Sequence, residues 1–450
     1  MGNPVNELLG LEGLRALRVG ESGGECVIEA VGTEVLTACP DCGPVLGRLY
    51  GHGSQTQSFR DTPMHGMPTR LSVRRRRFQC QHCHKTLFEP LPAMDDKRLV
   101  TRRLLSHVRK HVFSETFASL ARHAGLDEKT VRNICEDFVA ELQATVRFQT
   151  PRVLGIDELK IVGAYRAVIT NAEKRCLFDM LPTRSKEDLL RYFQALPDKA
   201  RIEWVTMDMY HVYRDVVRQT LPNARIVVDR FHIERMANEV IEQMRKRFRK
   251  ELPGKERLKL KDERFLLLKR QHDLKPEQFG RLRAWFDRFP LLSEAHALKE
   301  GFMAIWDQSK TRADAEQAWL KWQANVSPEL RSNFKALITA MTNWHDEILN
   351  YFESSMTNAY TESSNNLTRT ANRMGRGYSF DVIRARMLYN NLALKEGLGV
   401  IQKPVSDEPR VSYTLTDALP PPRTRYTREV VAYGAYIPTL AKLADEGFFD

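Results

Sequence analysis

Residues 201–235, RIEWVTMDMYHVYRDVVRQTLPNARIVVDRFHIER, decide the fold that we expect for this chain. A mostly apolar run, Ile202–Met207, ends on Asp208, and a second run, Ala224–Val228, ends on Asp229. A helical pattern lies between the two runs and is broken by a proline, and another helix begins after Asp229. The stretch therefore predicts a strand, a helix, a strand and the start of a further helix.

The two aspartates of this stretch allow two interpretations. A carboxylate at the point where a buried strand ends is held rigidly at a sheet edge, where it can bind a metal or act as a base. Asp208 and Asp229 can instead cap the helices that follow them. His232 lies three residues after Asp229. The stretch alone does not decide between chemistry and capping, so the rest of the chain has to.

The chain before this stretch supplies three further strands and a helix. Apolar and β-branched runs predict them at residues 153–161, 165–170, 176–181 and 186–196. A three-stranded meander followed by helix, strand, helix and strand is the order of a ribonuclease-H-like α/β core with a mixed sheet. In that order the first and fourth strands are neighbours, so Asp157 and Asp208 converge, whereas Asp229 lies one strand further out. We therefore prefer Asp208 to Asp229 as the partner of Asp157.

A third carboxylate lies on a polar helical segment within residues 357–377. Five polar residues share one face of this helix at spacings of three or four: Asn358, Glu362, Asn366, Arg369 and Arg373. A single carboxylate among amides and arginines is unusual on a solvent-facing helix, and it suits one metal ligand beside a phosphate backbone. Gly375 and Gly377 are expected to end the helix, and residues 380–394 form a further amphipathic one.

Residues 233–352 have an almost wholly helical pattern. Aromatic residues at helical spacing predict the core of this region: Trp285, Phe286, Phe289, Trp306, Trp319, Trp322 and Trp344. Two strongly basic runs, 244–250 and 255–270, are either solvated helix faces or contacts to a DNA backbone. An all-helical insertion at this place can cover DNA while the α/β core stays intact.

Two Cys-x-x-Cys pairs, separated by 37 residues, mark the N-terminal region. Each pair can turn two thiolates toward one ion. The four ligands predicted for one structural Zn²⁺ are Cys39, Cys42, Cys80 and Cys83. The alternative is two pairs of reduced thiols in turns. Between the pairs lies a run of arginines that is either a solvated face or a contact to DNA phosphates. The run consists of Arg74, Arg75, Arg76 and Arg77.

A helix-turn-helix pattern follows the cysteine pairs. Phe117 and Leu120 give one helix an apolar face, Gly125 suits a sharp turn, and Asp127 can cap a second helix. The residues expected to face a DNA groove are Lys129, Thr130, Arg132 and Asn133. An ordinary helical hairpin is the alternative. DNA binding is favoured because the preceding residues 97–111 carry six Lys/Arg and no acid.

Composition favours a polyanionic partner and excludes a membrane span. The chain of 450 residues has 69 basic and 57 acidic residues, a formal net charge of +12. No apolar run approaches the ~18 residues of a membrane helix, and the N-terminus lacks the layout of a signal peptide. The seven cysteines, four of them in the two pairs, suit a reducing compartment with one metal site. We therefore expect a cytoplasmic protein.

As a set, these motifs resemble bacterial insertion-sequence transposases of the DDE type, in particular the ISL-three (ISL3) family. The resemblance covers nearly the whole chain, including the cysteine pairs and the helix-turn-helix. It rests further on Gly155-Ile-Asp157-Glu, Asp208-Met-x-x-x-Tyr213-Arg, Pro222-Asn-Ala-Arg-Ile-Val-Val-Asp229-Arg-Phe-His232, Thr361-Glu362-x-x-Asn365-Asn366 and Arg384-Ala-Arg386.

Three carboxylates without thiolates suit two Mg²⁺ (or Mn²⁺) ions about 3.5–4 Å apart in phosphodiester chemistry. The resemblance implies that Asp157, Asp208 and Glu362 form the catalytic triad. His232 belongs to a motif similar to the (C/D)-x-x-H signature of the Mutator and hAT superfamilies, which implies a place near the scissile phosphate. The family further implies double-stranded DNA partners (terminal inverted repeats and target), a homodimer in the synaptic complex, and a nucleoid-associated location in the bacterial cytoplasm.

Two other functions compete with transposition. One is a domesticated, non-catalytic DNA-binding regulator, against which the intact triad argues. The other is a nuclease for RNA–DNA hybrids, which the helix-turn-helix makes less natural. The domains that we expect are a zinc-binding domain (1–95), a helix-turn-helix domain (96–150), the first part of the core (151–235), the helical insertion (236–355), the closing helices of the core (356–400) and a C-terminal tail (401–450).

Overall fold

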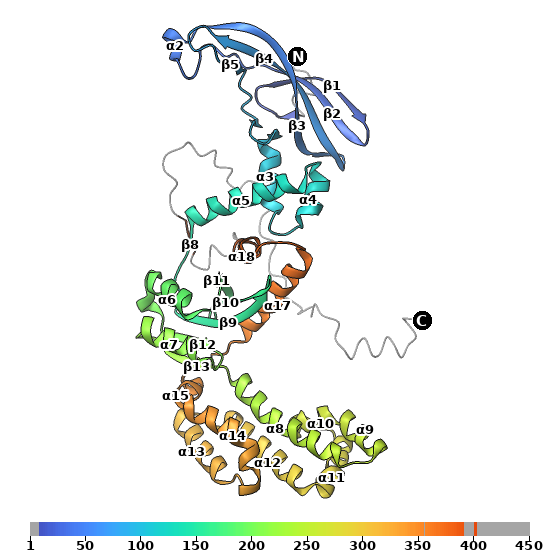
Figure 1. The fold of residues 1–450 in the computed structure, drawn as a ribbon, viewed down its shortest axis with the longest axis vertical. Coiled ribbons are helices and arrows are strands. Elements are labelled where there is room, and N and C mark those ends of the chain that lie inside the picture. Colours follow the sequence, from blue (N-terminus) through green and yellow to red (C-terminus); the bar gives the residue numbers. More distant parts are fainter. Residues whose placement is uncertain (1–8, 355, 391–399, 403–450) are drawn as a thin grey trace, which may run out of the picture. The chain divides into compact units, whose positions relative to one another are not determined.

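The computed structural model of the chain describes residues 9–354, 356–390 and 400–402 (Figure 1). The end of the helix predicted for residues 380–394 and nearly all of the tail predicted for residues 401–450 lie outside the described residues. None of the helices in the described part of the chain is long and apolar enough to cross a membrane.

The N-terminal region is mainly a β-sheet. Its strands follow the order β1-β2-β4-β3-β7-β6, and β5 pairs with β4. The elements are β1 (Leu14–Ser22), β2 (Glu25–Gly32), α2 (Gly43–Leu46), β3 (Leu49–Met64), β4 (Met67–Cys80), β5 (Thr86–Phe88), β6 (Met94–Asp95) and β7 (Val100–Thr101). Ile28, Phe59 and Leu71 are fully or almost fully buried in the core of this sheet.

Three helices follow, α3 (Arg102–His111), α4 (Phe117–Ala124) and α5 (Glu128–Thr145). Gly125 ends α4 in the left-handed region at φ 63°, which a glycine adopts without strain. Asp127 caps α5, because its side chain accepts a hydrogen bond from the Thr130 backbone N–H at 2.7 Å. Val131 and Ile134 are fully buried on the inner face of α5. The predicted helix-turn-helix is therefore confirmed in its turn, its cap and its buried face.

A five-stranded mixed sheet forms the α/β core, in the order β11-β10-β9-β12-β13. Its strands are β9 (Val153–Ile161), β10 (Ala164–Asn171), β11 (Cys176–Leu181), β12 (Trp204–Met207) and β13 (Arg225–Val228). The first three pair antiparallel, whereas β12 is parallel to both β9 and β13. This topology confirms the predicted core, including the adjacency of its first and fourth strands.

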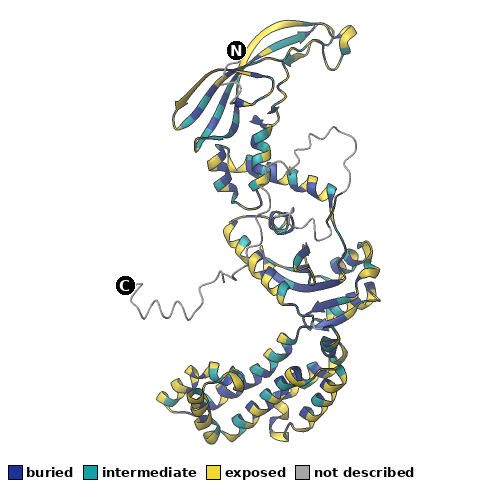
Figure 2. Ribbon diagram, turned by 180° about the vertical axis from the view of Figure 1, so that it is seen from behind, coloured by how far each residue is buried: buried dark blue, intermediate teal, exposed yellow. Residues whose placement is uncertain are grey.

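The core sheet is covered on both faces. On one face α6 (Lys186–Ala195) and α7 (His211–Thr220) bury Phe193 and Tyr213 against the strands. On the other, α17 (Ala359–Met374) and α18 (Phe380–Tyr389) close the sheet. A 3₁₀ turn, η1 (Lys199–Arg201), precedes β12. Short strands β8 (Val146–Phe148) and β14 (Val400–Gln402) pair antiparallel with each other. Buried residues follow the strands of this core in Figure 2.

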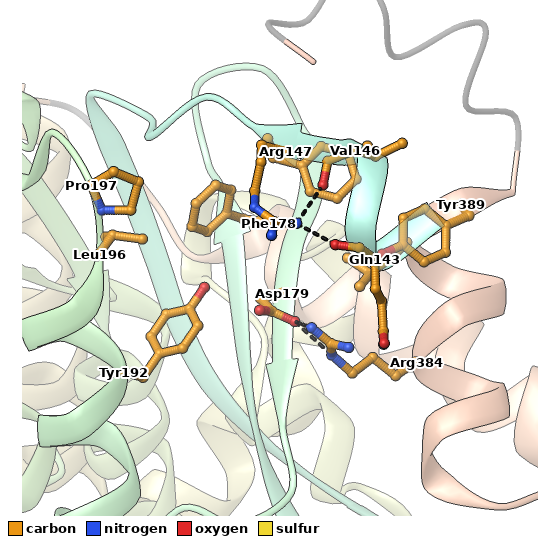
Figure 3. Close-up of a pocket in the computed structure, with 12 residues that line it drawn as sticks. Gln143, Val146, Arg147, Phe178, Asp179, Tyr192, Leu196, Pro197, Arg384 and Tyr389 are labelled. Carbon is orange, nitrogen blue, oxygen red and sulfur yellow. Dashed lines mark hydrogen bonds and ion pairs between the residues drawn. The ribbon is translucent and has the colours of Figure 1, made fainter. Parts of the chain in front are cut away.

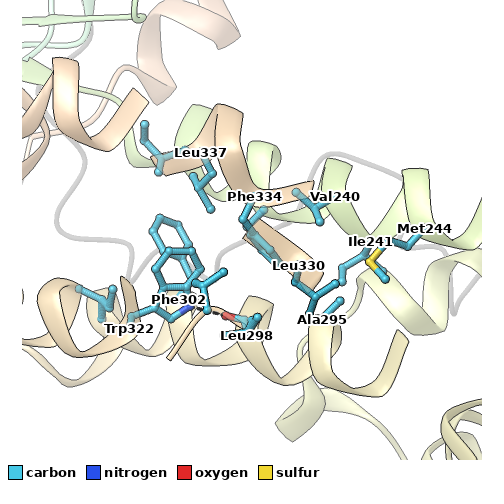
Figure 4. Close-up of a cluster of buried hydrophobic side chains, with 14 of the residues drawn as sticks. Val240, Ile241, Met244, Ala295, Leu298, Phe302, Trp322, Leu330, Phe334 and Leu337 are labelled. Carbon is cyan, nitrogen blue, oxygen red and sulfur yellow. Dashed lines mark hydrogen bonds between the residues drawn. The ribbon is translucent and has the colours of Figure 1, made fainter. Parts of the chain in front are cut away.

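Between β13 and α17 the described chain is helical, as predicted. The elements are α8 (Arg230–Lys250), α9 (Gly254–Asp262), α10 (Arg264–Leu268), η2 (Gln271–Asp273), α11 (Pro276–Arg288), α12 (Pro290–Gln308), α13 (Arg312–Ala324), α14 (Pro328–Asn343), α15 (His345–Leu349) and α16 (Tyr351–Ser354). Aromatic and aliphatic side chains from several helices meet in one core, where Phe302, Trp322 and Phe334 lie together (Figure 4). The predicted aromatic core is confirmed.

Candidate active site and zinc site

The three predicted catalytic acids line one cleft of about 610 Å³. Asp157 lies on β9, Asp208 follows the last residue of β12, and Glu362 lies in the first turn of α17. The cleft is lined by Asp157, Glu158, Lys160, Tyr165, Asp208, His232, Arg235, Glu362, Asn365, Asn366 and Arg369. Residues more than 200 positions apart in the chain therefore share one surface, and most of their polar neighbours are cationic or amide groups.

The strand register explains why Asp157 and Asp208 meet. Ile156 of β9 pairs with Met207 of β12, so Asp157, inside β9, lies beside Asp208, which follows the end of β12. Asp229 follows β13, one strand further out, and its buried side chain accepts a hydrogen bond from the Phe231 backbone N–H at 3.0 Å. Helix capping is thus the observed role of Asp229, whereas the cap of α7 is not made by Asp208.

Gly155 allows α17 to lie close against the sheet. A Cβ atom added at Gly155 would lie 2.4 Å from Thr170 Oγ1 and 2.5 Å from Thr361 Oγ1. These two hydroxyl groups are 2.8 Å apart and hydrogen bonded, which joins β10 to the first turn of α17. Because Glu362 follows Thr361, this close packing also fixes where Glu362 enters the cleft beside Asp157. The close packing of these groups therefore explains why a glycine stands at position 155 of the Gly-Ile-Asp-Glu motif.

Asp157 is the most buried of the three acids, with 8% of its surface exposed. Its Oδ1 accepts a hydrogen bond from the Glu158 backbone N–H at 2.7 Å, and its Oδ2 accepts one from Asn365 Nδ2 at 2.6 Å. Burial raises the pKa of Asp157 to about 7, because the charged carboxylate is poorly solvated, and the negative charge of Asp208 adds to the effect. A cation in the cleft would relieve both contributions.

His232 contacts the second acid directly. Its Nε2 lies 2.9 Å from Asp208 Oδ1. The hydrogen bond to Asp208 raises the pKa of His232 above its usual value, although burial of the imidazole acts in the opposite direction. The Asp208 carboxylate therefore stabilises the protonated form of the ring. The sequence placed His232 near the reacting phosphate, and the structure places it beside a predicted metal ligand in the same cleft.

Five further residues line the cleft but were not among the predicted site residues: Glu158, Lys160, Tyr165, Arg235 and Asn365. Glu158 and Asn365 stand inside the quoted motifs, so their positions carried a signal. Lys160 and Tyr165 carried none, because their place depends on how the β9–β10 hairpin pairs. Among the predicted DNA contacts on α17, Asn366 and Arg369 line the cleft and Arg373 does not.

The acidic cleft and the cysteine cluster differ in how closely their metal-ligand atoms lie together. Among the residues that the structure describes, only the four cysteines form a group of three or more Asp, Glu, His or Cys ligand atoms within 4.8 Å of one another. The acids are the ligand type that Mg²⁺ prefers, but they are more widely spaced. Their roles, like those of the DNA contacts, stay predictions.

The cysteine cluster has the dimensions of a tetrahedral zinc site. Cys39 Sγ lies 3.8 Å from Cys83 Sγ, and Cys80 Sγ lies 4.0 Å from Cys42 Sγ. Four sulfurs about 2.3 Å from one central ion are separated by about 3.8 Å. Burial and the neighbouring thiols raise the pKa of Cys42 to about 12, whereas hydrogen bonds from backbone N–H groups, foremost that of Cys83, lower the pKa of Cys80 to about 7. A thiolate is thus accessible near neutral pH, as zinc requires.

The arginine run of β4 is only partly available for DNA. Arg75 is 5% exposed, donates to the Glu89 backbone oxygen at 2.6 Å, and pairs with Asp96 at 2.8 Å. Arg76 pairs at 2.7 Å with the carboxylate of Glu89, which is fully buried. Successive side chains of a strand point to opposite faces, so Arg74 stays exposed. The burial of Arg75 corrects its prediction as a phosphate contact.

On α5 the predicted groove-facing residues divide into two kinds. The Thr130 hydroxyl donates to Asp127 at 2.7 Å, and Arg132 pairs with Glu128 at 3.2 Å. Both are therefore engaged within their own helix. Lys129 and Asn133 are exposed.

The Arg384-Ala-Arg386 motif has a structural role. Arg384 pairs with Asp179 of β11 at 2.7 Å in a separate pocket of about 300 Å³ (Figure 3). Arg386 donates to the backbone oxygens of Val112 at 3.2 Å and Glu115 at 2.6 Å, between α3 and α4. The second arginine therefore satisfies carbonyl groups at the end of one helix and before the next, which explains its burial.

A mixed sheet with an acidic cleft, joined to a four-thiolate site and a helix-turn-helix, defines a DNA-processing enzyme of the DDE class. Residues 154–387 match the ISL3 family model of DDE transposases. Residues 36–83 match the zinc finger of the transposases of IS204, IS1001, IS1096 and IS1165, and residues 89–139 match the helix-turn-helix domain of transposase family ISL3. The chain belongs to the ISL3 family of DDE transposases, as its motifs predicted.

The chain is also similar to two curated transposases, over different shares of its length. The chain is 26% identical over 358 residues to the transposase for insertion sequence element IS1001 of Bordetella parapertussis, which covers 77% of this chain and 86% of that protein. It is 28% identical over 205 residues to the transposase for IS1557 of Mycobacterium tuberculosis, covering 39% and 46%. The zinc-finger match and the four-sulfur geometry support one structural Zn²⁺. The helix-turn-helix and transposase domains imply DNA binding.

Proposed function

We propose that this transposase binds the terminal inverted repeats of its own element, cuts the ends by hydrolysis to expose 3′-OH groups, and joins them to target DNA by transesterification. The observation that carries the proposal is the single cleft shared by Asp157, Asp208 and Glu362. Two divalent ions at these carboxylates would activate the attacking oxygen and stabilise the leaving one. Among the described residues, Glu158 is the only other acid that lines the cleft.

The chain's own residues support this chemistry in distinct ways. Asp157 and Asp208 place two carboxylates side by side where β12 ends, and burial together with the charge of Asp208 raises the pKa of Asp157. The nearby His232 orients Asp208 through its Nε2. Arg235 and Arg369 line the same cleft and are suited to hold phosphate oxygens of the DNA backbone.

End recognition is assigned to the zinc and helix-turn-helix regions. Lys129 and Asn133 are exposed on α5 and suit a DNA groove, with Arg74 as an exposed cation on β4. A transposase has to hold two ends together, so we propose a homodimer in the synaptic complex. Light scattering of the complex with end DNA tests this assembly, and an active complex that is strictly monomeric contradicts it.

Strand cleavage of end-containing DNA with Mg²⁺ or Mn²⁺ tests the chemistry. Asp208→Ala should lower the cleavage rate by about 10³-fold or more, because several kcal/mol of charge stabilisation are lost at about 1.4 kcal/mol per tenfold. The matched control is Asp215→Ala, an exposed aspartate of α7, which should cleave normally. Cleavage at the normal rate by Asp208→Ala would contradict the two-metal assignment.

A further inference from the structure

An aromatic ring stands in the acidic cleft with nearly half of its surface free. Tyr165, near the start of β10, is 47% exposed and lines the cleft with the three acids. Large aromatic side chains usually bury more of their surface than this. Its phenol ring does not contribute to the hydrophobic cores, and neither metal binding nor the orientation of the acids requires it.

Tyr165 is held in place by a stack of planar groups. The Arg184 guanidinium carbon lies 4.4 Å from the centroid of the Tyr165 ring and 5.1 Å from that of Tyr210. Arg184 is in turn fixed by Glu158, whose carboxylate it contacts at 2.7 Å. The guanidinium therefore lies against two rings and one carboxylate, so the orientation of Tyr165 is set before any ligand binds.

Positive charge surrounds this ring. Lys160, the cross-strand partner of Tyr165 in the β9–β10 hairpin, places its Nζ 5.6 Å from the ring centroid. Arg235 and Arg369 line the same cleft. A rigid, exposed ring among cations is the combination with which proteins hold single-stranded nucleic acid, since bases stack on the ring and phosphates pair with the cations.

We propose that Tyr165 is a stacking platform for one nucleobase that leaves the duplex beside the scissile phosphate. The proposal rests on the proposed function and adds its substrate conformation: an unpaired nucleotide at the cut end. The phosphate of that nucleotide lies toward the carboxylates, and its base lies on the Tyr165 ring. Stacking on an aromatic side chain tolerates any base, so the platform imposes no sequence preference of its own.

The experiment is a double-mutant cycle that measures the coupling between the Tyr165 ring and the base. Cleavage rates are measured for the wild type and Tyr165→Ala on end-containing duplexes with a normal base or an abasic analogue at each nucleotide beside the cut. We expect Tyr165→Ala to lower the rate about tenfold on normal DNA. At one position the abasic analogue should lower the wild-type rate similarly and leave the Tyr165→Ala rate unchanged.

Two variants separate stacking from other roles of the residue. Tyr165→Phe keeps the ring and should retain the wild-type rate. Phe279→Ala removes another exposed ring, which belongs to α11 outside the cleft. That control should cleave normally. If Tyr165→Ala and the abasic analogue lower the rate independently at every position, or if Tyr165→Ala cleaves normally, the platform is ruled out.

A second readout does not depend on cleavage. With Ca²⁺ in place of Mg²⁺, 2-aminopurine at each nucleotide beside the cut reports local unpairing and stacking by its fluorescence. We expect a change at one position in the wild type and in Tyr165→Phe, and its loss in Tyr165→Ala. A position-specific signal without any cleavage in Mg²⁺ upholds the platform and contradicts the proposed chemistry. Normal cleavage without that signal contradicts the platform and upholds the proposed chemistry.

Discussion

The zinc cluster and the acidic cleft both gather ligand-type residues from distant parts of the chain, but they hold them differently. The four sulfur atoms lie within 4.8 Å of one another, at the spacing of a tetrahedral site. The three acids line a cleft of about 610 Å³ and do not form such a compact group. We therefore expect the cysteine cluster to close around a single ion and the acidic cleft to stay open to a substrate.

The difference follows from what positions each ligand. Each cysteine pair belongs to one local turn, so bringing two turns together completes the site. The acids depend instead on the pairing of β9 with β12 and on the packing of α17 against β9. Folding brings all the ligands of a structural metal site together around one ion. We expect a catalytic site to keep its charges uncompensated, and the raised pKa of Asp157 agrees with this expectation.

The largest effect should come from breaking the closed site. Cys80→Ser should release the zinc and unfold the region that it holds, because structural zinc contributes about 10 kcal/mol or more in small zinc domains. We expect zinc content by mass spectrometry to fall below one ion per chain, and residues 36–83 to become sensitive to protease. Cys176→Ser, in β11 of the core, serves as the control and should keep its zinc. A Cys80→Ser protein with a full zinc complement contradicts the four-thiolate site.

The open site should be most sensitive to its packing. Gly155→Ala places a methyl group within 2.5 Å of two hydroxyl oxygens, so a neighbour must shift, and we expect α17 to move. We expect strand cleavage to fall roughly 10²-fold, because a displacement of about 1 Å at a catalytic group costs that much, and stability to fall by about 1–3 kcal/mol.

The control for Gly155→Ala is Gly280→Ala in α11, where an added Cβ meets no atom within 4 Å. This change should leave cleavage unaltered and stabilise the helix slightly. Normal cleavage by Gly155→Ala would show that the position of α17 does not matter for the chemistry.

Much of the fold followed from the sequence because its determinants are local or topological. Alternating runs of strand and helix predicted the mixed core, and the order of the strands placed Asp157 next to Asp208 rather than Asp229. Gly125 and Asp127 predicted the turn and the cap of the helix-turn-helix. In each case the physical cause lies within a few residues or in strand order.

Other features depend on partners that no pattern reveals. The arginine run appears as a cationic surface in the sequence, but the strand turns Arg75 inward toward Glu89 and Asp96 from later segments. Asn365 contacts Asp157 only because α17 lies close against β9 at Gly155. Both depend on the register between elements, which the residues themselves do not display.

Asn365 should have a smaller effect than Gly155, since it acts through Asp157. Asn365→Ala removes the N–H donor 2.6 Å from Asp157 Oδ2. We expect cleavage to fall about 10–100-fold, as for other groups that orient metal ligands. Because that donor favours the charged carboxylate, its loss raises the pKa of Asp157 further. The pH of half-maximal cleavage should therefore rise, which a purely structural defect does not cause.

Two comparisons sharpen the result for Asn365. Asn365→Asp places a second carboxyl group against Asp157, so its pH profile should shift further upward. Asn372→Ala, on the same helix but outside the cleft-lining residues, should behave as the wild type. An unshifted pH profile in Asn365→Ala means that the amide does not position Asp157.

The smallest effect concerns the stability of the metal-free core. Asp157 has a pKa of about 7 in the folded chain against a usual value of 3.8. Below pH 3.8 the carboxyl is neutral in both states, and between pH 3.8 and 7 the unfolded chain loses its proton first, so stability falls as the pH rises. Asp157→Asn removes this cost, at most about 4 kcal/mol. We expect its metal-free core to melt a few degrees higher than the wild type at pH 8, and at the same temperature near pH 4. Added Mg²⁺ should stabilise the wild type and not the variant, whereas an unchanged melting temperature at pH 8 would mean that Asp157 carries no buried charge.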